Sequence, residues 1–432
     1  MHIGKRIKYL RKEKKLSQLD VCEGIVSSSH FSNIESGRYE ASKDILFLLA
    51  ERLQVPNDYL VLSQSDSEEI NRYLDMYEQA FRTGIKESDQ FIKKYQQRLT
   101  YIPSITQELS YLIIYCSHYL RKGDLSKVEK PYDQISLYLA EYNLKSLSQE
   151  VRYKYHYVSA LYDFFKRDYS SSYHHFQLAL DNVYRQEDQA VCLFNIGLVF
   201  FKIKDYYRSL SYVKEAKELY IDLKHLNSTV NAYILIGNIH IELQDYPTAK
   251  TMLTKGYDLA LKEEFIEEQT KILNNLGTLE QKKGNYDQSI EHFSKSLDKK
   301  WAHYDKEDLY DLNSLYSSYF GLLTAHLLNQ HFDTLRQLIK QADKYCIDEI
   351  QRFKVQVIEA QMEYELGNDQ VYETKMEEAI DYFYQHSLWD QLENIGNHFS
   401  DYLSSKRKYK KANEYLSIEL EVLKKLYKER LL

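Results

Sequence analysis

The stretch from Ile236 to Ala249 reads IGNIHIELQDYPTA, and variants of it stand forty residues before and forty residues after. The earlier copy, from residue 196 to 209, reads IGLVFFKIKDYYRS, and the later copy, from 276 to 289, reads LGTLEQKKGNYDQS. In each copy an apolar residue precedes a glycine, and a tyrosine follows that glycine nine positions later. Self-similarity at a fixed period predicts one structural unit repeated along the chain.

The offsets from the glycine continue beyond the quoted stretch. A small residue comes twelve positions after each glycine, and a bulky residue comes sixteen positions after it, namely Val213, Leu253 and Phe293. Small residues at fixed offsets let a helix lie close to its antiparallel partner, while the bulky residue fills the gap between successive pairs. A generic helical bundle with glycines placed by chance offers no reason for several positions to recur together. The spacing is therefore typical of tetratricopeptide (TPR) helix pairs.

Weaker copies of this register extend the array in both directions. They are centred on Ala160, Ala360 and Ser400, and fainter ones occur near Met76, Cys116 and Leu323. Only 13 glycines and 4 prolines interrupt the 432 residues, so long helices and almost no strand are expected. We predict an all-α fold with a right-handed TPR solenoid of about nine helix pairs, closed by a last helix over residues 415–432.

The first sixty residues follow a different pattern. Ser17 is positioned to cap one short helix, Gly24 breaks it, Ser27 caps the next helix and Gly37 ends it. We predict a helix-turn-helix domain over residues 1–62, here called the head. The serine-rich segment 63–70 is expected to be a flexible linker, and residues 71–432 to form the TPR array. The apolar seam between the two short helices is expected to contain Val21, Ile25, Val26, Phe31 and Ile34.

Composition and motifs exclude several classes of protein. The formal net charge is −7, which argues against a protein that coats nucleic acid over its whole surface. No apolar run is long enough to cross a membrane and no signal peptide is recognisable, so we expect a cytoplasmic protein with no membrane partner. The four cysteines are isolated and lack metal-ligand spacing. We predict no metal, no cofactor and, without a phosphate loop or nucleophile motif, no enzymatic activity.

The head carries a local basic run on this acidic chain, with seven Lys and Arg residues among its first fifteen. Such a run is usually a solvated helix face. The motifs that follow it, Leu-Ser-Gln over residues 16–18 and Ile-Glu-Ser-Gly-Arg over residues 34–38, resemble the phage-repressor-like (XRE) helix-turn-helix family. The resemblance covers about residues 1–62. It implies that the second helix of the motif lies in the major groove of DNA.

The resemblance assigns roles by position. The expected base-reading residues are Ser28, Ser29 and Asn33, with His30 and Ser32 as further candidates, and the expected DNA-backbone contacts are Gln18, Arg38, Tyr39, Lys5 and Arg6. For Arg11 and Glu35 it implies a structural pair that ties the first helix to the recognition helix. Because consecutive serines are short and adaptable, readout through water or DNA shape is expected to contribute.

A helix-turn-helix followed by a long TPR array resembles the RRNPP family of peptide-sensing regulators, and the number of repeats is similar to that of its longer members. The resemblance implies a cytosolic transcription regulator that acts in quorum sensing and binds a short signalling peptide in the concave TPR surface. It also implies a homodimer on a two-fold operator and, for some longer members, a phosphorelay partner. The alternative is a DNA-binding scaffold whose array docks a signalling or phosphorelay protein and receives no peptide.

The concave face can be assigned from the repeat register, with the glycine as position eight. An asparagine amide offers both a donor and an acceptor, and it can pair with an extended peptide backbone whatever the peptide's sequence. The alternative for these asparagines is a solvated polar face or a bond to the next helix. Single lysines could meet a peptide carboxylate but are more often solvated. The predicted peptide-binding residues are Lys202, Asn231, Asn238, Lys271, Asn274, Thr278 and Gln281.

Overall fold

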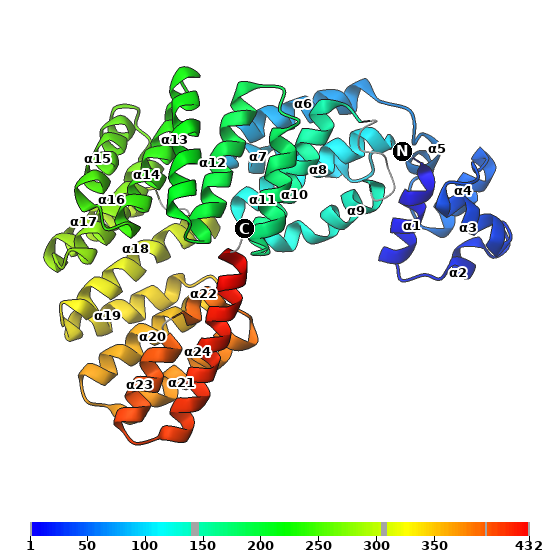
Figure 1. Ribbon diagram of the computed structural model, residues 1–432. Helices are drawn as coiled ribbons and strands as arrows, with labels where there is room; N and C mark the ends of the chain where they lie inside the picture. The colour runs from blue at the N-terminus through cyan, green and yellow to red at the C-terminus, as the bar shows by residue number, and fades with distance from the viewer. Residues whose placement is uncertain (1, 140–146, 304–308, 394, 431–432) are drawn as a thin grey trace. The chain divides into compact units, whose positions relative to one another are not determined.

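The computed structural model describes residues 2–139, 147–303, 309–393 and 395–430 (Figure 1). Throughout these ranges the ordered elements are helices, and no strand occurs. The predicted all-α fold is therefore confirmed. The chain divides into two compact units, Met1–Tyr184 and Arg185–Leu432, which are described separately below.

The head opens the first unit with five short helices. Ser17 and Ser27 cap the second and third of them as predicted, and Gly37 ends the third in the left-handed conformation with φ +76°. Val21, Phe31 and Ile34 lie in the buried core between these helices, while Ile25 and Val26 are partly buried against it. The helices are α1 (Ile3–Glu13), α2 (Gln18–Cys22), α3 (Ser28–Ser36), α4 (Lys43–Arg52) and α5 (Asn57–Val61).

Three helix pairs complete the first unit. Their apolar residues join those of the head in one continuous buried cluster. His156 on the third pair's first helix places its Nδ1 3.2 Å from that of His175 on the second helix. The elements are α6 (Glu68–Thr83), α7 (Ile85–Tyr95), η1 (Gln96–Leu99), α8 (Ile105–Lys122), η2 (Leu125–Lys127), α9 (Glu129–Leu139), α10 (Gln149–Phe165) and α11 (Tyr169–Leu180).

The second unit holds six further pairs, so the described residues form nine, as predicted. The closing helix begins at Tyr409 rather than at residue 415, because Arg407, with φ +60°, already completes the preceding turn. The elements are α12 (Gln186–Lys202), α13 (Tyr206–Asp222), α14 (Leu226–Glu242), α15 (Tyr246–Lys262), α16 (Ile266–Lys282), α17 (Tyr286–Trp301), α18 (Leu309–Leu328), α19 (Phe332–Ala342), η4 (Asp343–Tyr345), α20 (Glu349–Glu365), α21 (Asp369–Gln385), α22 (Trp389–Leu392), α23 (Ile395–Ser405) and α24 (Tyr409–Arg430).

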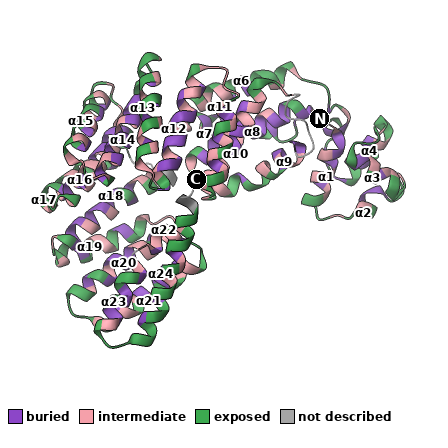
Figure 2. Ribbon diagram, viewed as in Figure 1, coloured by how far each residue is buried: buried purple, intermediate pink, exposed green. Residues whose placement is uncertain are grey.

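The repeating glycines lie where the two helices of a pair touch. A Cβ atom added at Gly197 would lie 2.3 Å from Val213 Cγ2, and one at Gly237 would lie 2.7 Å from Leu253 Cδ2. The bulky residue at offset sixteen therefore occupies the space that the glycine leaves. Figure 2 shows the result, with buried residues along the faces where neighbouring helices meet and exposed residues on the outward faces.

Candidate nucleic-acid interface and inner face of the array

The first turn of α3 is solvent-exposed at the positions predicted to read bases. Ser28, Ser29 and Ser32 are exposed, and the Ser27 Oγ that caps the helix accepts a hydrogen bond from the His30 backbone N–H at 3.3 Å. The Ser29 hydroxyl lies 3.2 Å from the Ser27 hydroxyl. This end of the helix thus presents a row of short hydroxyls, each able to donate or accept a hydrogen bond.

The other predicted residues on and after α3 are less open. Asn33 and His30 are half-buried, and the His30 ring packs edge-on against the Tyr39 ring with centroids 4.8 Å apart. Arg38 and Tyr39 are exposed directly after the helix end at Gly37. The tyrosine therefore supports the recognition helix as well as facing solvent.

The first helix fixes α3 by direct backbone contact. A Cβ atom at Gly4 would lie 2.0 Å from the Ile34 carbonyl oxygen, so only glycine permits this approach of α1 to the end of α3. The Arg11 guanidinium donates two hydrogen bonds to the Glu35 carboxylate, at 2.6 and 3.0 Å. The structural pairing expected of these two residues is present.

The Gln18 side chain also donates to Glu35, at 2.7 Å. Its amide therefore holds α2 to α3, with one amide hydrogen and the carbonyl oxygen remaining for other partners. Nothing in the sequence spacing distinguishes this structural role from the expected phosphate contact.

Arg6 does not lie on the exposed surface of the head. Its side chain is fully buried, and Nη2 donates to Glu108 Oε2 on α8 at 2.7 Å and to the Ile102 carbonyl at 3.1 Å. The Tyr138 hydroxyl of α9 donates to the same carboxylate oxygen at 2.6 Å. The guanidinium also packs 4.0 Å over the Tyr59 ring. We therefore correct the expectation that Arg6 contacts DNA, because a buried charge is kept only where partners such as these compensate its desolvation.

The segment expected to be a flexible linker is hydrogen-bonded to the start of α8. The Ser63 carbonyl accepts from the Ile105 N–H at 3.0 Å, and the Asp66 carboxylate accepts from the Ser104 and Thr106 hydroxyls at 2.5 and 2.9 Å. A carboxylate is favoured there because a helix N-terminus carries partial positive charge. The polar composition of the segment did not reveal these partners.

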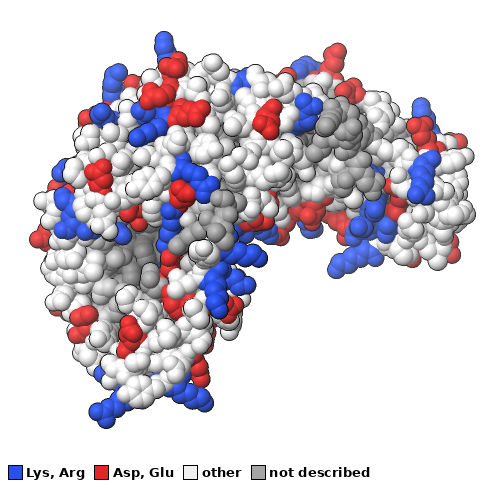
Figure 3. All heavy atoms as spheres, viewed as in Figure 1, with Lys and Arg blue, Asp and Glu red and all other residues white. Residues whose placement is uncertain are grey.

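The basic residues at the end of α1 face solvent. Lys12, Lys14 and Lys15 are exposed at the end of α1, and Lys5 is half-buried. Figure 3 shows Lys and Arg side chains gathered over this part of the head. Positive charge beside an open recognition helix is suited to the phosphates that flank a major groove.

The first helices of successive pairs in the second unit pack side by side: α12 against α14, α14 against α16, α16 against α18, and α18 against α20. Their common exposed side is called the inner face here. Asn238 is half-buried on α14, and its side chain makes no hydrogen bond to any described residue. The Gln281 Nε2 atom on α16 is buried without a partner in the part of the chain that the structure describes.

Other predicted peptide-binding residues already have partners inside the array. Asn231 donates to the side chain and carbonyl of Asn227, one turn earlier on α14. Asn274 donates to the Ser317 hydroxyl at 3.2 Å and accepts from the Ser318 hydroxyl at 3.0 Å, which joins α16 to α18. Lys271 forms ion pairs with Glu267 and Glu268. Thr278 donates to the Asn274 carbonyl at 3.2 Å, and Lys202 is exposed at the end of α12.

Lys300 is a member of this polar cluster that the sequence pattern did not predict. It is buried, and Nζ donates to the Ser318 hydroxyl at 2.8 Å and to the Ser314 carbonyl at 2.6 Å. Burial, together with the nearby Lys271, lowers the Lys300 pKa to about 7. Lys300 and Asn274 therefore both hydrogen-bond to the Ser318 hydroxyl. These bonds depend on the packing of α17 against α18.

Two family models match the chain: a helix-turn-helix model over residues 7–60 and a tetratricopeptide-repeat model over residues 270–298. A curated relative is the transcriptional activator NprA of Geobacillus stearothermophilus, 20% identical over 428 residues, covering 94% of this chain and 99% of NprA. A helix-turn-helix followed by TPR-like helix pairs is the domain order expected of an RRNPP-type regulator. The helix-turn-helix model supports DNA as a partner of this chain, and NprA is a transcriptional activator.

Solved structures that share this fold include a Rap protein and NprR. A Rap protein complexed with competence and sporulation factor superposes with a TM-score of 0.66 at 16% identity, covering 84% of this chain and 100% of the Rap chain. NprR in complex with its cognate peptide NprX gives a TM-score of 0.59 at 16% identity, covering 84% of this chain and 100% of NprR. Within the described residues of this chain, no helix has the length and apolarity to cross a membrane, and no three His, Cys, Asp or Glu side chains are grouped to hold a metal ion.

Proposed function

We propose that this regulator binds a specific operator through α3 and that a short signalling peptide, bound in the concave surface of the array, controls that binding in quorum sensing. The supporting observation is the combination of an open recognition helix with an array whose inner face carries unpaired amides. NprR, which has the same fold, has a crystal structure in complex with its cognate peptide NprX.

The proposed DNA contacts are those that remain accessible. Ser28, Ser29, Ser32 and Asn33 are the base-reading candidates with His30 beside them, while Lys5, Gln18, Arg38 and Tyr39 contact the backbone. Arg6 is left out because it is fully buried. One head reads one half-site, so we also propose a homodimer on a two-fold operator. Sedimentation equilibrium should then give twice the chain mass of 51.6 kDa, and a monomer at micromolar concentration would contradict the dimer.

The proposed peptide contacts centre on Asn238 and Gln281. Both side chains lie on inner helices and have an amide group with no protein partner among the described residues. An extended peptide can supply the missing donor or acceptor, and an unpaired buried amide costs about 1 to 3 kcal/mol. Asn231, Lys202, Lys271, Asn274 and Thr278 remain proposed contacts, but several of them would have to exchange an existing bond.

Mass spectrometry of the natively purified protein tests the proposal by looking for a co-purified peptide. With that peptide, calorimetry on Asn238→Ala should show about ten-fold weaker binding and an unchanged melting temperature, because the side chain bonds to no described residue. Asn274→Ala should weaken binding and also lower the melting temperature, since Asn274 joins α16 to α18. Unchanged affinity in both variants would place the ligand elsewhere.

One observation favours the second candidate, a DNA-binding scaffold that docks a signalling or phosphorelay protein. Asn231 and Asn274 have internal partners, so fewer amides are open to a peptide than the sequence suggests. If no peptide co-purifies and none binds in solution, the scaffold becomes the better description of the array.

A further inference from the structure

The inner face continues beyond α18 onto α20. In the repeat register, Gln361, Tyr364 and Glu365 of α20 follow Ala360 at the offsets at which Asn238, Ile241 and Glu242 follow Gly237. An amide and an acid therefore recur at two of these offsets, while a tyrosine replaces the isoleucine. Asp401 of α23 follows Ser400 by one position, where α14 has an asparagine. The C-terminal pairs thus add an aromatic ring and a second carboxylate to this face.

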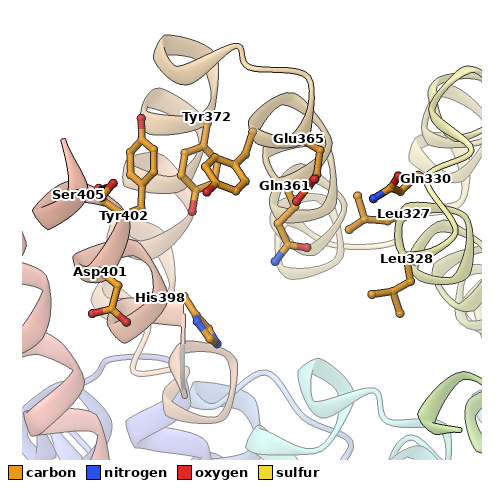
Figure 4. Close-up of a pocket in the computed structure, with 11 residues that line it drawn as sticks. Leu327, Leu328, Gln330, Gln361, Glu365, Tyr372, His398, Asp401, Tyr402 and Ser405 are labelled. Atoms are coloured by element: carbon orange, nitrogen blue, oxygen red, sulfur yellow. Dashed lines mark hydrogen bonds between the residues drawn. The ribbon is translucent and has the colours of Figure 1, made fainter. Parts of the chain in front are cut away.

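These residues line a pocket of about 650 Å³ (Figure 4). Tyr372 and Tyr402 lie at one side of it, Asp401 lies below them on α23, and Gln361 and Glu365 stand across from them on α20. The volume is several times that of one side chain. It is sufficient for a long side chain together with the backbone that carries it.

Three tyrosines form the aromatic wall and hold one another at fixed angles. The Tyr372 and Tyr402 rings meet edge to face with centroids 4.7 Å apart, and Tyr364 and Tyr402 do so at 5.6 Å. The Tyr402 hydroxyl donates to Glu373 at 3.0 Å, which fixes that ring further. The wall is thus preorganised, so little side-chain freedom is lost when a ligand enters.

The charge in the pocket is negative and has no counter-charge in it. Glu365 and Asp401 are exposed, and within the described residues neither carboxylate forms an ion pair. No Lys or Arg is among the lining residues. Just outside, Lys406 places Nζ 5.5 Å from the Tyr402 ring centroid while it pairs with Asp369. One of these rings therefore already has a cation near it.

We propose that this pocket binds a cationic side chain of the peptide, a guanidinium or an ammonium group, between the tyrosine wall and the carboxylates of Glu365 and Asp401. The proposal rests on the proposed peptide-sensing function and adds that the ligand carries a basic residue. Aromatic faces and carboxylates both favour a cation with an apolar stem. The Gln361 amide, beside Glu365 on α20, can pair with the peptide backbone next to that basic residue.

A small probe tests the pocket without any knowledge of the peptide. N-acetyl-arginine amide and N-acetyl-citrulline amide have nearly the same shape, but only the first is charged. Ligand-observed NMR on the full chain should show binding of the arginine probe and about ten-fold weaker binding of citrulline, because citrulline loses the charge-assisted and cation–π contacts. Equal binding of the two probes would overturn the proposal.

Variants locate the probe. Glu365→Gln combined with Asp401→Asn, and separately Tyr364→Ala, should each reduce arginine binding by about ten-fold. Glu414→Gln, an exposed acid on α24 outside the pocket, should have no effect. The melting temperature should be unchanged in the double carboxylate variant, since neither carboxylate forms an ion pair among the described residues. Loss of binding in Glu414→Gln, or retention in the double variant, contradicts the site.

A random heptapeptide library separates this proposal from the function on which it rests. Peptides retained by the protein and sequenced by mass spectrometry should be enriched in Arg or Lys, and the enrichment should disappear with the double variant. If the retained peptides are not enriched in Arg or Lys, peptide binding is supported but the proposal that this pocket binds a cationic side chain is overturned. If no peptide is retained, the proposed function fails, and the arginine probe decides the pocket alone.

Discussion

At the scale of single residues, the recognition helix gives the most direct prediction. Ser29→Ala combined with Asn33→Ala should reduce the preference for the operator over random DNA by about 1 to 3 kcal/mol for each good base contact that is lost. Competition binding at fixed salt measures this preference. Arg38→Ala is the control, because losing a phosphate contact should weaken all sequences alike and flatten the salt dependence. A double variant that discriminates as well as the parent would show that other residues read the operator.

His156 makes a second prediction at this scale, for the pH dependence of stability. Burial, followed by the neighbouring His175 and His174, lowers the His156 pKa to about 4. Below pH 6.5 the unfolded chain therefore gains a proton at His156 that the folded protein takes up only near pH 4. Stability should accordingly fall as the pH drops through this window, by about 2 kcal/mol at pH 5 from this residue.

Urea unfolding at pH 7 and pH 5 checks this dependence. His156→Gln should lose less stability between the two pH values than the parent protein, whereas His225→Gln, at an exposed position, should behave like the parent. An equal loss in the parent and in His156→Gln would mean that other groups cause the acid sensitivity.

At the scale of helices, Gly237 sets the distance between α14 and α15. Gly237→Ala should destabilise the second unit by about 1 to 3 kcal/mol, because the new Cβ would lie 2.7 Å from the Leu253 side chain. Thermal unfolding measures the effect. Leu253→Val in the same chain should recover part of the loss, and a double-mutant cycle without coupling would argue against this contact.

The helix scale is also where the sequence was most informative. The tyrosines that recur nine positions after the glycines mark helix starts, since α13 begins at Tyr206 and α15 at Tyr246. Repeated spacing identifies such positions because every copy of the repeat has the same packing between its two helices. The roles of Arg6 and Asn274 could not be predicted in this way. Their partners, Glu108 and Ser318, lie far away in sequence, and no local pattern distinguishes a buried or bonded polar residue from an exposed one.

At the scale of the whole molecule, the contact between Arg6 and Glu108 links the head to the array within the first unit. Glu108→Gln leaves the buried guanidinium without its counter-charge, which should cost about 3 to 5 kcal/mol. We expect segment 63–67 to resist limited proteolysis in the parent protein and to become the first cleavage site in Glu108→Gln. Glu69→Gln, which removes an exposed ion pair with Arg98, is the matched control. Early cleavage at 63–67 in the parent would support the independent linker suggested by composition.

The burial of Arg6 also bears on how such a regulator can be re-engineered or can diverge. A head that inserts its own arginine beneath α8 and α9 is not an interchangeable module. A chimaera that places a foreign head on this array leaves Glu108 and the Tyr138 hydroxyl without their cation. In the reverse chimaera, the head of this chain on a foreign array carries the Arg6 guanidinium without its carboxylate partner. If the α3 serines read the operator as we propose, new specificity is more accessible through them than through exchange of the whole head. A functional exchange would have to carry residues 1–139 as one piece.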